Sequence, residues 1–236
     1  MSINERLNQL YGDWEKEHQG EHLVRHGIVD EETYRKAEPR IVLLGKEVNA
    51  MKEPQFNLLE YLIYTLEKSR EGEGFKKSET QAGLWAYGIL KECPDYPKSK
   101  LVLNRYTAEG IRSIGWTNLS KICGGGKANH RWKEHAVKQW DLTKEELKIM
   151  DPQLILCSGE DTYGLVTEIL GLERKRLLDK TEKRRKINYS IWPLENHKFL
   201  CLDFYHHAAR GGYGKYYGIL EEVYNKCKFE ELFTWK

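Results

Sequence analysis

The stretch "DFYHHAARGGYGKYYG" (residues 203–218) ends an apolar run with adjacent histidines and follows them with an arginine, glycines and tyrosines. An imidazole there can stabilise developing negative charge, and the guanidinium of Arg210 and the glycine N–H groups can contact phosphates. Adjacent residues on a strand point to opposite faces, so at most one of His206 and His207 would face a crevice. A metal site built on this histidine pair is therefore disfavoured.

A carboxylate follows another apolar run. Residues 45–50 read "GKEVNA", and Glu47 at this position could hold or deprotonate a water molecule, as general-base catalysis requires. The alternative is a polar turn that only ends a strand. The spacing is not that of a phosphate-binding loop, which needs G-x-x-x-x-G-K-[ST].

An amide follows a third run, in "GWTNLSKICGGGKANH". The side chain of Asn118 can donate and accept hydrogen bonds along a planar ligand edge, although an isolated asparagine at a strand end is more often a turn former. The glycines at 124–126 allow a close backbone approach to a ligand, or form a mobile loop.

Four short apolar, β-branched runs are predicted to be the strands that position these groups. They are "RIVLLG" (40–45), "IRSIGWTNL" (111–119), "PQLILCSG" (152–159) and "HKFLCLDFYHH" (197–207). Helical patterns lie between them, at 56–70, 143–150 and 162–172. This alternation predicts a parallel sheet between helices with right-handed crossovers, and a ligand crevice outside the carboxyl ends of the strands. A further helix, over about residues 2–20, is expected to pack on the outside.

Composition favours an ordinary folded domain. The chain has 236 residues, of which 40% are hydrophobic and 31% charged, which predicts one domain and excludes a disordered chain. The N-terminus lacks the pattern of a secretory signal, and no run approaches the roughly 20 apolar residues of a membrane span, so a cytoplasmic location is expected. The five cysteines are scattered singly, which favours reduced, buried thiols over a zinc or iron-sulfur site.

The charge distribution is more informative than the total. The net charge of +2 does not by itself indicate a nucleic-acid partner, but residues 172–188 contain eight Lys and Arg against three acids. Such a segment could follow a phosphate backbone, or it could be a solvated surface loop.

Taken together and in this order, the four strand-end motifs resemble those of the uracil-DNA glycosylase superfamily. "GKEVN" resembles its first motif, "WTNLSK" its base-reading motif, "DPQLILCSGEDTYG" the start of a later strand, and "HHAARGG" its final loop. By position, Glu47 matches the water-holding residue, Asn118 the base-reading asparagine and His206 the histidine that stabilises the departing base. Val48 stands where proline is usual, and His207 and Ala208 replace the usual proline and serine.

The resemblance implies a three-layer α/β/α sandwich with a central four-stranded parallel sheet, as one domain over residues 1–236 with a helical N-terminal arm at about 1–38. It implies a monofunctional DNA glycosylase that flips a nucleotide out and leaves an abasic site, with no metal or organic cofactor. The expected partner is single- or double-stranded DNA, with no membrane and a monomeric chain. The expected site residues are Glu47 and His206 for catalysis, Asn118, Phe56, Asn49 and Gly45 for the base, and Arg210, Tyr213, Lys215, Lys121, Arg184 and Arg185 for DNA. For Phe56 a core aromatic is an equal alternative.

Val48, Asn49 and Ala50 replace the proline and bulky residues that close the pocket beside the pyrimidine ring in the superfamily, and Ala208 is small. The resemblance therefore implies a pocket that accepts a substituent at pyrimidine C5. A hydroxymethylated or glucosylated cytosine of bacteriophage DNA would then be the target, and the role would be defence against phage. Excision of plain uracil in DNA repair is the alternative. Two other functions stay open: a non-catalytic nucleic-acid-binding protein of the same fold, and an enzyme acting on free nucleosides or nucleotides.

Overall fold

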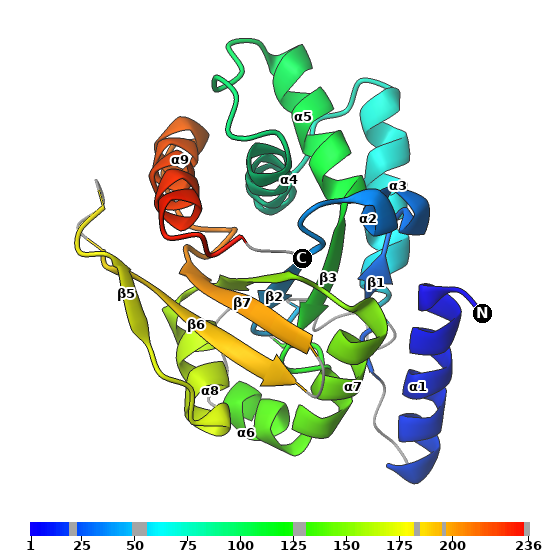
Figure 1. The fold of residues 1–236 in the computed structure, drawn as a ribbon. Helices are drawn as coiled ribbons and strands as arrows, with labels where there is room; N and C mark the ends of the chain where they lie inside the picture. The colour runs from blue at the N-terminus through cyan, green and yellow to red at the C-terminus, as the bar shows by residue number, and fades with distance from the viewer. Residues whose placement is uncertain (19–22, 49–55, 125–130, 182–184, 195–196, 234–236) are drawn as a thin grey trace.

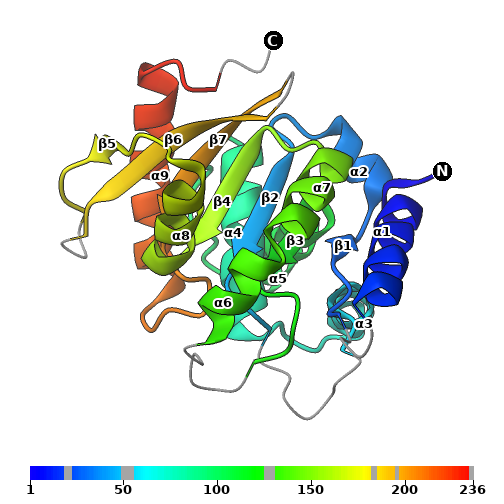
Figure 2. The same ribbon diagram turned by 90° about the horizontal axis from the view of Figure 1, so that it is seen from below.

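A mixed sheet lies at the centre of the computed structural model, which describes the chain except for residues 19–22, 49–55, 125–130, 182–184, 195–196 and 234–236. The strands are β1 (Gly27–Ile28), β2 (Ile41–Gly45), β3 (Ile114–Asn118), β4 (Leu154–Ser158), β5 (Lys175–Leu178), β6 (Ile187–Leu194) and β7 (His197–Phe204). Within the described residues they form one seven-stranded sheet in the order β1-β3-β2-β4-β7-β6-β5 (Figure 2).

The four predicted runs form β2, β3, β4 and β7, which are neighbours in the sheet and run parallel. The expected total of four strands is wrong, because the sheet continues at both edges. β1 pairs antiparallel with β3, while β6 pairs antiparallel with β7 and β5 with β6. The short β1 lies within the segment that was expected to be a purely helical arm, and β5 and β6 come from the basic segment and the residues after it.

Helices cover both faces of the sheet, so the molecule has three layers (Figure 1). The helices are α1 (Ile3–Glu17), α2 (Glu31–Lys36), α3 (Leu58–Arg70), α4 (Lys77–Leu90), α5 (Lys100–Arg112), α6 (Arg131–Lys138), α7 (Trp140–Met150), α8 (Glu160–Leu170) and α9 (Tyr213–Phe229). α1 packs against α7, as expected for a helix outside the sheet.

Strand alternation divides the apolar side chains into two cores. On β2, Ile41 and Leu43 belong to the core under α3, α4, α5 and α9, whereas Val42 and Leu44 belong to the core under α1, α7 and α8. This division follows from the period of two in a strand, and burial on both faces explains why β2 is continuously apolar. No helix in the described part of the chain is long and apolar enough to cross a membrane.

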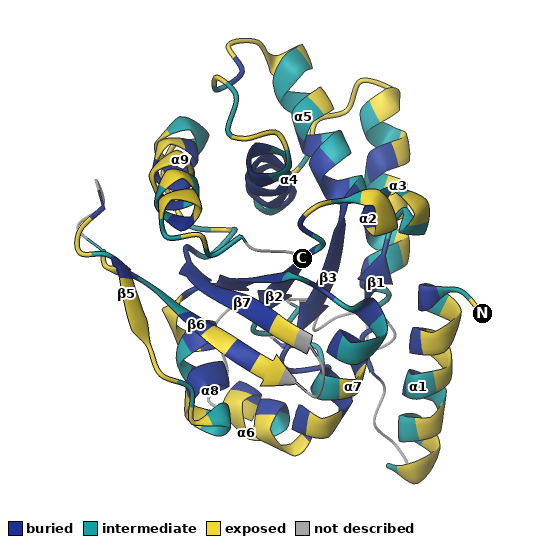
Figure 3. Cartoon of the chain, in the orientation of Figure 1, coloured by how far each residue is buried: buried dark blue, intermediate teal, exposed yellow. Residues whose placement is uncertain are grey.

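Helix α4 shows why part of the fold has no clear sequence signal. Ten of its residues are buried (Figure 3), so its sequence lacks the one-sided apolar pattern of a surface helix. By contrast, α1 begins with a capping box between Ser2 and Glu5, and α3 begins at Asn57, whose side chain accepts from the N–H of Glu60 at 3.1 Å. Side-chain caps also precede α2, at Asp30, and α5, at Ser99.

Candidate functional site

The carboxyl ends of the parallel strands lie side by side. Gly45 at the end of β2 pairs with Asn118 at the end of β3, and Ser158 at the end of β4 pairs with Phe204 at the end of β7. Since β2 also pairs with β4, the segments that follow the four strands begin along one edge of the sheet. This edge carries the three principal residues expected from the sequence, namely Glu47, Asn118 and His206.

The side chain of Asn118 is buried and held in one orientation. Its Nδ2 atom lies 3.1 Å from Nε2 of His26, and the residue is 3% exposed. Its Oδ1 atom lies against the Cα of Gly45, where a β-carbon at position 45 would overlap it. Gly45 therefore provides the space that the carboxamide occupies.

Glu47 lies in a segment held to the loop after β3. The N–H of Ser120 donates to the carbonyl of Lys46 at 2.8 Å, and the N–H of Gly124 donates to the carbonyl of Val48, also at 2.8 Å. The carboxylate of Glu47 lies so close to Gly124 that a β-carbon at 124 would overlap it. The close approach that Gly124 allows is thus to a carboxylate of this chain. The remaining glycines, Gly125 and Gly126, lie outside the described residues.

The two histidines do not point to opposite faces, and that prediction is wrong. β7 ends at Phe204, so both residues lie beyond the strand and escape its alternation. Their rings stack, with centroids 4.7 Å apart and 16° between the planes. The Nδ1 atom of His207 lies 2.6 Å from Oγ of Ser158, and burial lowers the pKa of His207 to about 3. His207 is therefore a neutral anchor for the loop.

His206 is half-buried and has a defined tautomer. Its Nδ1 atom accepts a hydrogen bond from the N–H of Ala208 at 3.1 Å, so in the neutral ring the proton is on Nε2. Burial lowers the pKa of His206, as does the positive charge of Lys46, and Asp161 only partly opposes them. At neutral pH this imidazole is an uncharged N–H donor.

Lys46, next to Glu47, contacts two other side chains. Its ammonium forms an ion pair with Asp161 in the first turn of α8, and lies 5.4 Å from the ring centroid of Trp132. The hydrogen bond from Lys46 lowers the pKa of Asp161. An amine engaged in this way is poorly suited to act as a nucleophile.

Lys121 is not a DNA-binding residue of the surface, contrary to expectation. Its side chain and that of Glu146 on α7 are both fully buried, and they form an ion pair. The ammonium also donates to Oγ1 of Thr117 at 2.9 Å. Burial alone would raise the pKa of Glu146, but the contacts with Lys121 and His26 together outweigh it and the pKa falls to about 2. A charge buried in this way must be paired, and this requirement explains the position of Lys121.

Arg185 is also not available for DNA in this structure. Its guanidinium forms an ion pair with the buried Asp203 and donates to the carbonyl of Phe204 at 2.9 Å. Of the basic segment, Lys175 and Arg176 lie exposed on the edge strand β5, where charges discourage pairing with another sheet. Arg184 lies outside the described residues.

The other expected site residues have mixed positions. Arg210 and Lys215 are exposed, and Tyr213, the first residue of α9, is half-buried. Phe56 is half-buried against the core under α3, with its ring 5.6 Å from that of Tyr61, so it is at least partly a core aromatic. Asn49 lies outside the described residues.

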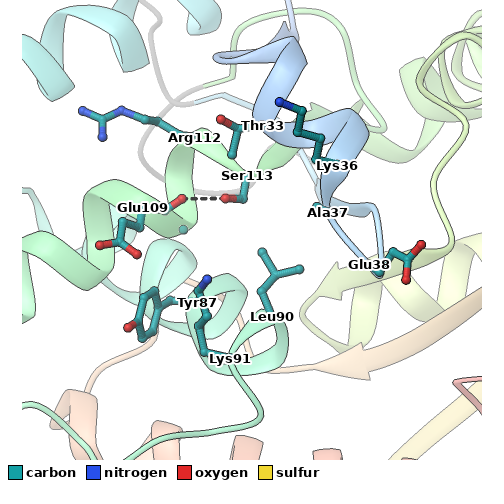
Figure 4. A pocket seen from close by; sticks show the side chains of 11 residues that line it. Thr33, Lys36, Ala37, Glu38, Tyr87, Leu90, Lys91, Glu109, Arg112 and Ser113 are labelled. Carbon is teal, nitrogen blue, oxygen red and sulfur yellow. Dashed lines mark hydrogen bonds between the residues drawn. The ribbon is translucent and has the colours of Figure 1, made fainter.

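Two hollows on the described surface lie away from this edge. One, of about 420 Å³, opens where the strands begin, because Glu38 precedes β2 and Ser113 precedes β3. Figure 4 shows its lining, which includes Thr33 and Lys36 of α2, Tyr87 and Leu90 of α4, and Glu109 and Arg112 of α5. The other, of about 670 Å³, lies between α3 and α5 and is bordered by four cations, Arg70, Lys100, Arg105 and Arg112. Neither hollow includes Glu47, Asn118 or His206.

Two residues that contact the site, His26 and Glu146, were not predicted from the sequence. Glu146 had a signal, because it stands four residues after Leu142 and four before Met150, on the buried face of an amphipathic helix. His26 had none, since its role depends on the pairing of β1 with β3. Within the described residues, no three His, Cys, Asp or Glu side chains come together as metal ligands.

Compared with models of known protein families and with curated proteins, this sequence matches none of them.

Proposed function

We propose that this protein is a monofunctional DNA glycosylase with the fold of the uracil-DNA glycosylase superfamily. It flips a pyrimidine nucleotide out of the stack and hydrolyses its N-glycosidic bond. The observation that carries the proposal is that one edge of the sheet bears a carboxylate, a fixed amide and a neutral imidazole, at Glu47, Asn118 and His206. A water activator, a base reader and an anion stabiliser are the three groups this reaction needs.

Glu47 would orient the attacking water. Loss of the base passes through a sugar with positive charge at its anomeric carbon, which a nearby carboxylate stabilises while it receives a proton from the water. The contact with Gly124 restricts where this carboxylate can lie. A side chain restricted in this way loses less entropy when it acts on the water.

His206 would support the departing base. Because its Nδ1 atom accepts from the N–H of Ala208, its Nε2–H group remains to donate to the negative charge that develops on the base. The lowered pKa keeps the ring neutral at working pH, so it stabilises the anion by a hydrogen bond without transferring a proton.

Asn118 would hold the flipped base through its Watson–Crick edge, which is how enzymes that flip bases identify them. Flipping costs a few kcal/mol, and phosphate contacts must offset it. Arg210, exposed on the loop after His206, is suited to such a contact.

The proposed target is a pyrimidine with a substituent at C5, such as hydroxymethylcytosine or its glucosylated form in phage DNA, which would make the protein a defence enzyme. Val48 follows Glu47 directly, and Ala208 is small and exposed. Plain uracil is the alternative target. The non-catalytic binder remains the second candidate, because His207, bonded to Ser158, replaces the proline and Ala208 the serine that the family places after its histidine.

The test is the formation of abasic sites in duplexes that carry one uracil or one modified cytosine. The wild-type protein should produce alkali-sensitive sites, and borohydride should trap no protein-DNA adduct. Glu47→Gln should bind the duplex normally but release base at least about 100-fold more slowly, the usual contribution of general-base catalysis. Glu168→Gln, at an exposed acid of α8, is the matched control and should be fully active. Binding without abasic sites in the wild type would favour the binder.

A further inference from the structure

A chain of polar contacts runs from the protein interior to Asn118. Oε1 of Glu146 lies 3.6 Å from Nδ1 of His26, and Nε2 of His26 lies 3.1 Å from Nδ2 of Asn118. The side chains of Glu146 and His26 are fully buried, and Asn118 is almost so. These three residues come from α7, from the segment before β1 and from the end of β3.

In this series of contacts Glu146 can only accept hydrogen bonds. It is ion-paired with Lys121, and it accepts hydrogen bonds from the hydroxyl groups of Tyr11 and, at 3.1 Å, of Thr117. Its pKa of about 2 keeps it a carboxylate. At 3.6 Å the contact between Nδ1 of His26 and the carboxylate is longer than a hydrogen bond, but the negative charge of Glu146 favours the tautomer whose proton is on the ring nitrogen that faces it.

The protonation of His26 determines which atom donates and which accepts in its contact with Asn118. Burial lowers the pKa of His26, so the ring is neutral and has a single N–H. With that proton on Nδ1, Nε2 is an acceptor, and Asn118 must present its Nδ2 group to it. The carboxamide oxygen is thereby directed to the other side, against Gly45.

We propose that Glu146 and His26 are positioning residues that fix the orientation of the Asn118 carboxamide and so determine which pyrimidine edge the site accepts. The inference rests on the proposed function, because it concerns the base that Asn118 reads. Neither residue touches the base. They act through the choice between the two orientations of one amide.

The orientation matters because the two classes of pyrimidine have opposite edges. A uracil-type base has an acceptor at position 4 and a donor at position 3, whereas a cytosine-type base has a donor at position 4 and an acceptor at position 3. An amide in one orientation matches only one of these orders for a base in a given position. Bidentate pairing of this kind discriminates by about 1–3 kcal/mol, which corresponds to roughly 5- to 150-fold in rate.

The first measurement is made on the wild-type full-length chain and needs no DNA. Nitrogen NMR of labelled protein distinguishes a protonated ring nitrogen from an unprotonated one. We expect His26 to carry its proton on Nδ1, and to keep it there in Tyr11→Phe, which leaves the carboxylate of Glu146 in place. A proton on Nε2 would overturn the proposal.

The second measurement uses the double variant Lys121→Met/Glu146→Leu, because apolar residues often replace a buried ion pair without loss of folding. Without the carboxylate, both ring tautomers become accessible and Asn118 can turn over. We expect the ratio of kcat/KM between a uracil duplex and a 5-hydroxymethylcytosine duplex to move toward unity by about tenfold or more. Tyr11→Phe should retain the wild-type ratio.

The outcomes separate the two proposals. A folded double variant with an unchanged ratio would show that Glu146 and His26 are only structural. If the double variant does not fold, the NMR result on the wild type still decides the orientation. If the wild-type protein releases no base at all, the proposed function fails, whereas the site of the His26 proton is still measured independently of it.

Discussion

The carboxamide oxygen of Asn118 lies in the space that a β-carbon of residue 45 would fill. Because Gly45 and Asn118 are paired across β2 and β3, neither can move without disturbing the parallel ladder. The glycine at the end of the first parallel strand is therefore a steric requirement of the amide beside it.

Gly45→Ala should displace the Asn118 carboxamide and reduce base release by about tenfold or more, because the added methyl group removes the amide from its bonding position. The contact lies at the edge of the sheet, so thermal stability should fall less than activity. The matched control is Gly218→Ala on α9, where a β-carbon meets nothing within 4 Å. Full activity of Gly45→Ala would separate Asn118 from base recognition.

His206→Ala should lower base release by about 100-fold or more with little effect on stability, since one donor to a developing anion is removed. His207→Asn should keep most of the activity, because an amide can replace Nδ1 in the hydrogen bond to Ser158. Single-turnover rates of the two variants provide the comparison. A greater loss of activity in His207→Asn than in His206→Ala would show that His207, and not His206, donates to the departing base.

Stability should decrease on mild acidification because of His207. Its folded pKa of about 3 lies below the unfolded value of about 6.5, so the unfolded state binds the proton first. The free energy of unfolding is therefore greatest above about pH 6.5 and falls as the pH is lowered toward 3. His26 contributes in the same direction. Urea unfolding at about pH 7 and about pH 5 should show a smaller decrease in His207→Asn than in the wild type.

Two basic residues should give opposite phenotypes. Arg210→Ala should weaken DNA binding and reduce the salt slope by about one, as expected for a lost phosphate contact. Lys121→Met should instead lower stability by about 3–5 kcal/mol, because it leaves Glu146 buried without its ion-pair partner. Its folded fraction should retain the wild-type salt slope. Salt titrations of DNA binding and denaturant unfolding of both variants distinguish a residue that contacts DNA at the surface from one that stabilises the interior.

The parallel part of the sheet was predictable because strands buried on both faces need continuous apolar, β-branched residues, as β2 and β4 show. Strand ends fall at one edge by topology, so the positions of Asn118 and Glu47 followed from the strands. The outer strands were missed for physical reasons. Two of the four residues of β5 are charged, and β1 has only two residues.

Local sequence patterns could not predict which residues of the site are buried. Lys121 follows β3 by three residues and reads as a surface cation, yet α7 brings Glu146 against it from a distant part of the chain. The histidines were wrongly assigned to opposite faces because the end of β7, three residues before His207, is decided by pairing with β4. Both errors concern tertiary contacts, which a local pattern does not contain.

Mass spectrometry of the bases released from matched duplexes is the most direct test of glycosylase activity. The duplexes contain uracil, 5-hydroxymethyluracil, 5-hydroxymethylcytosine or its glucosylated form at one position. We predict that the wild-type protein releases at least one C5-substituted base as the free base and that His206→Ala does so far more slowly. Release of uracil alone would contradict the enlarged pocket, and release of no base from any duplex would contradict the assignment as a glycosylase.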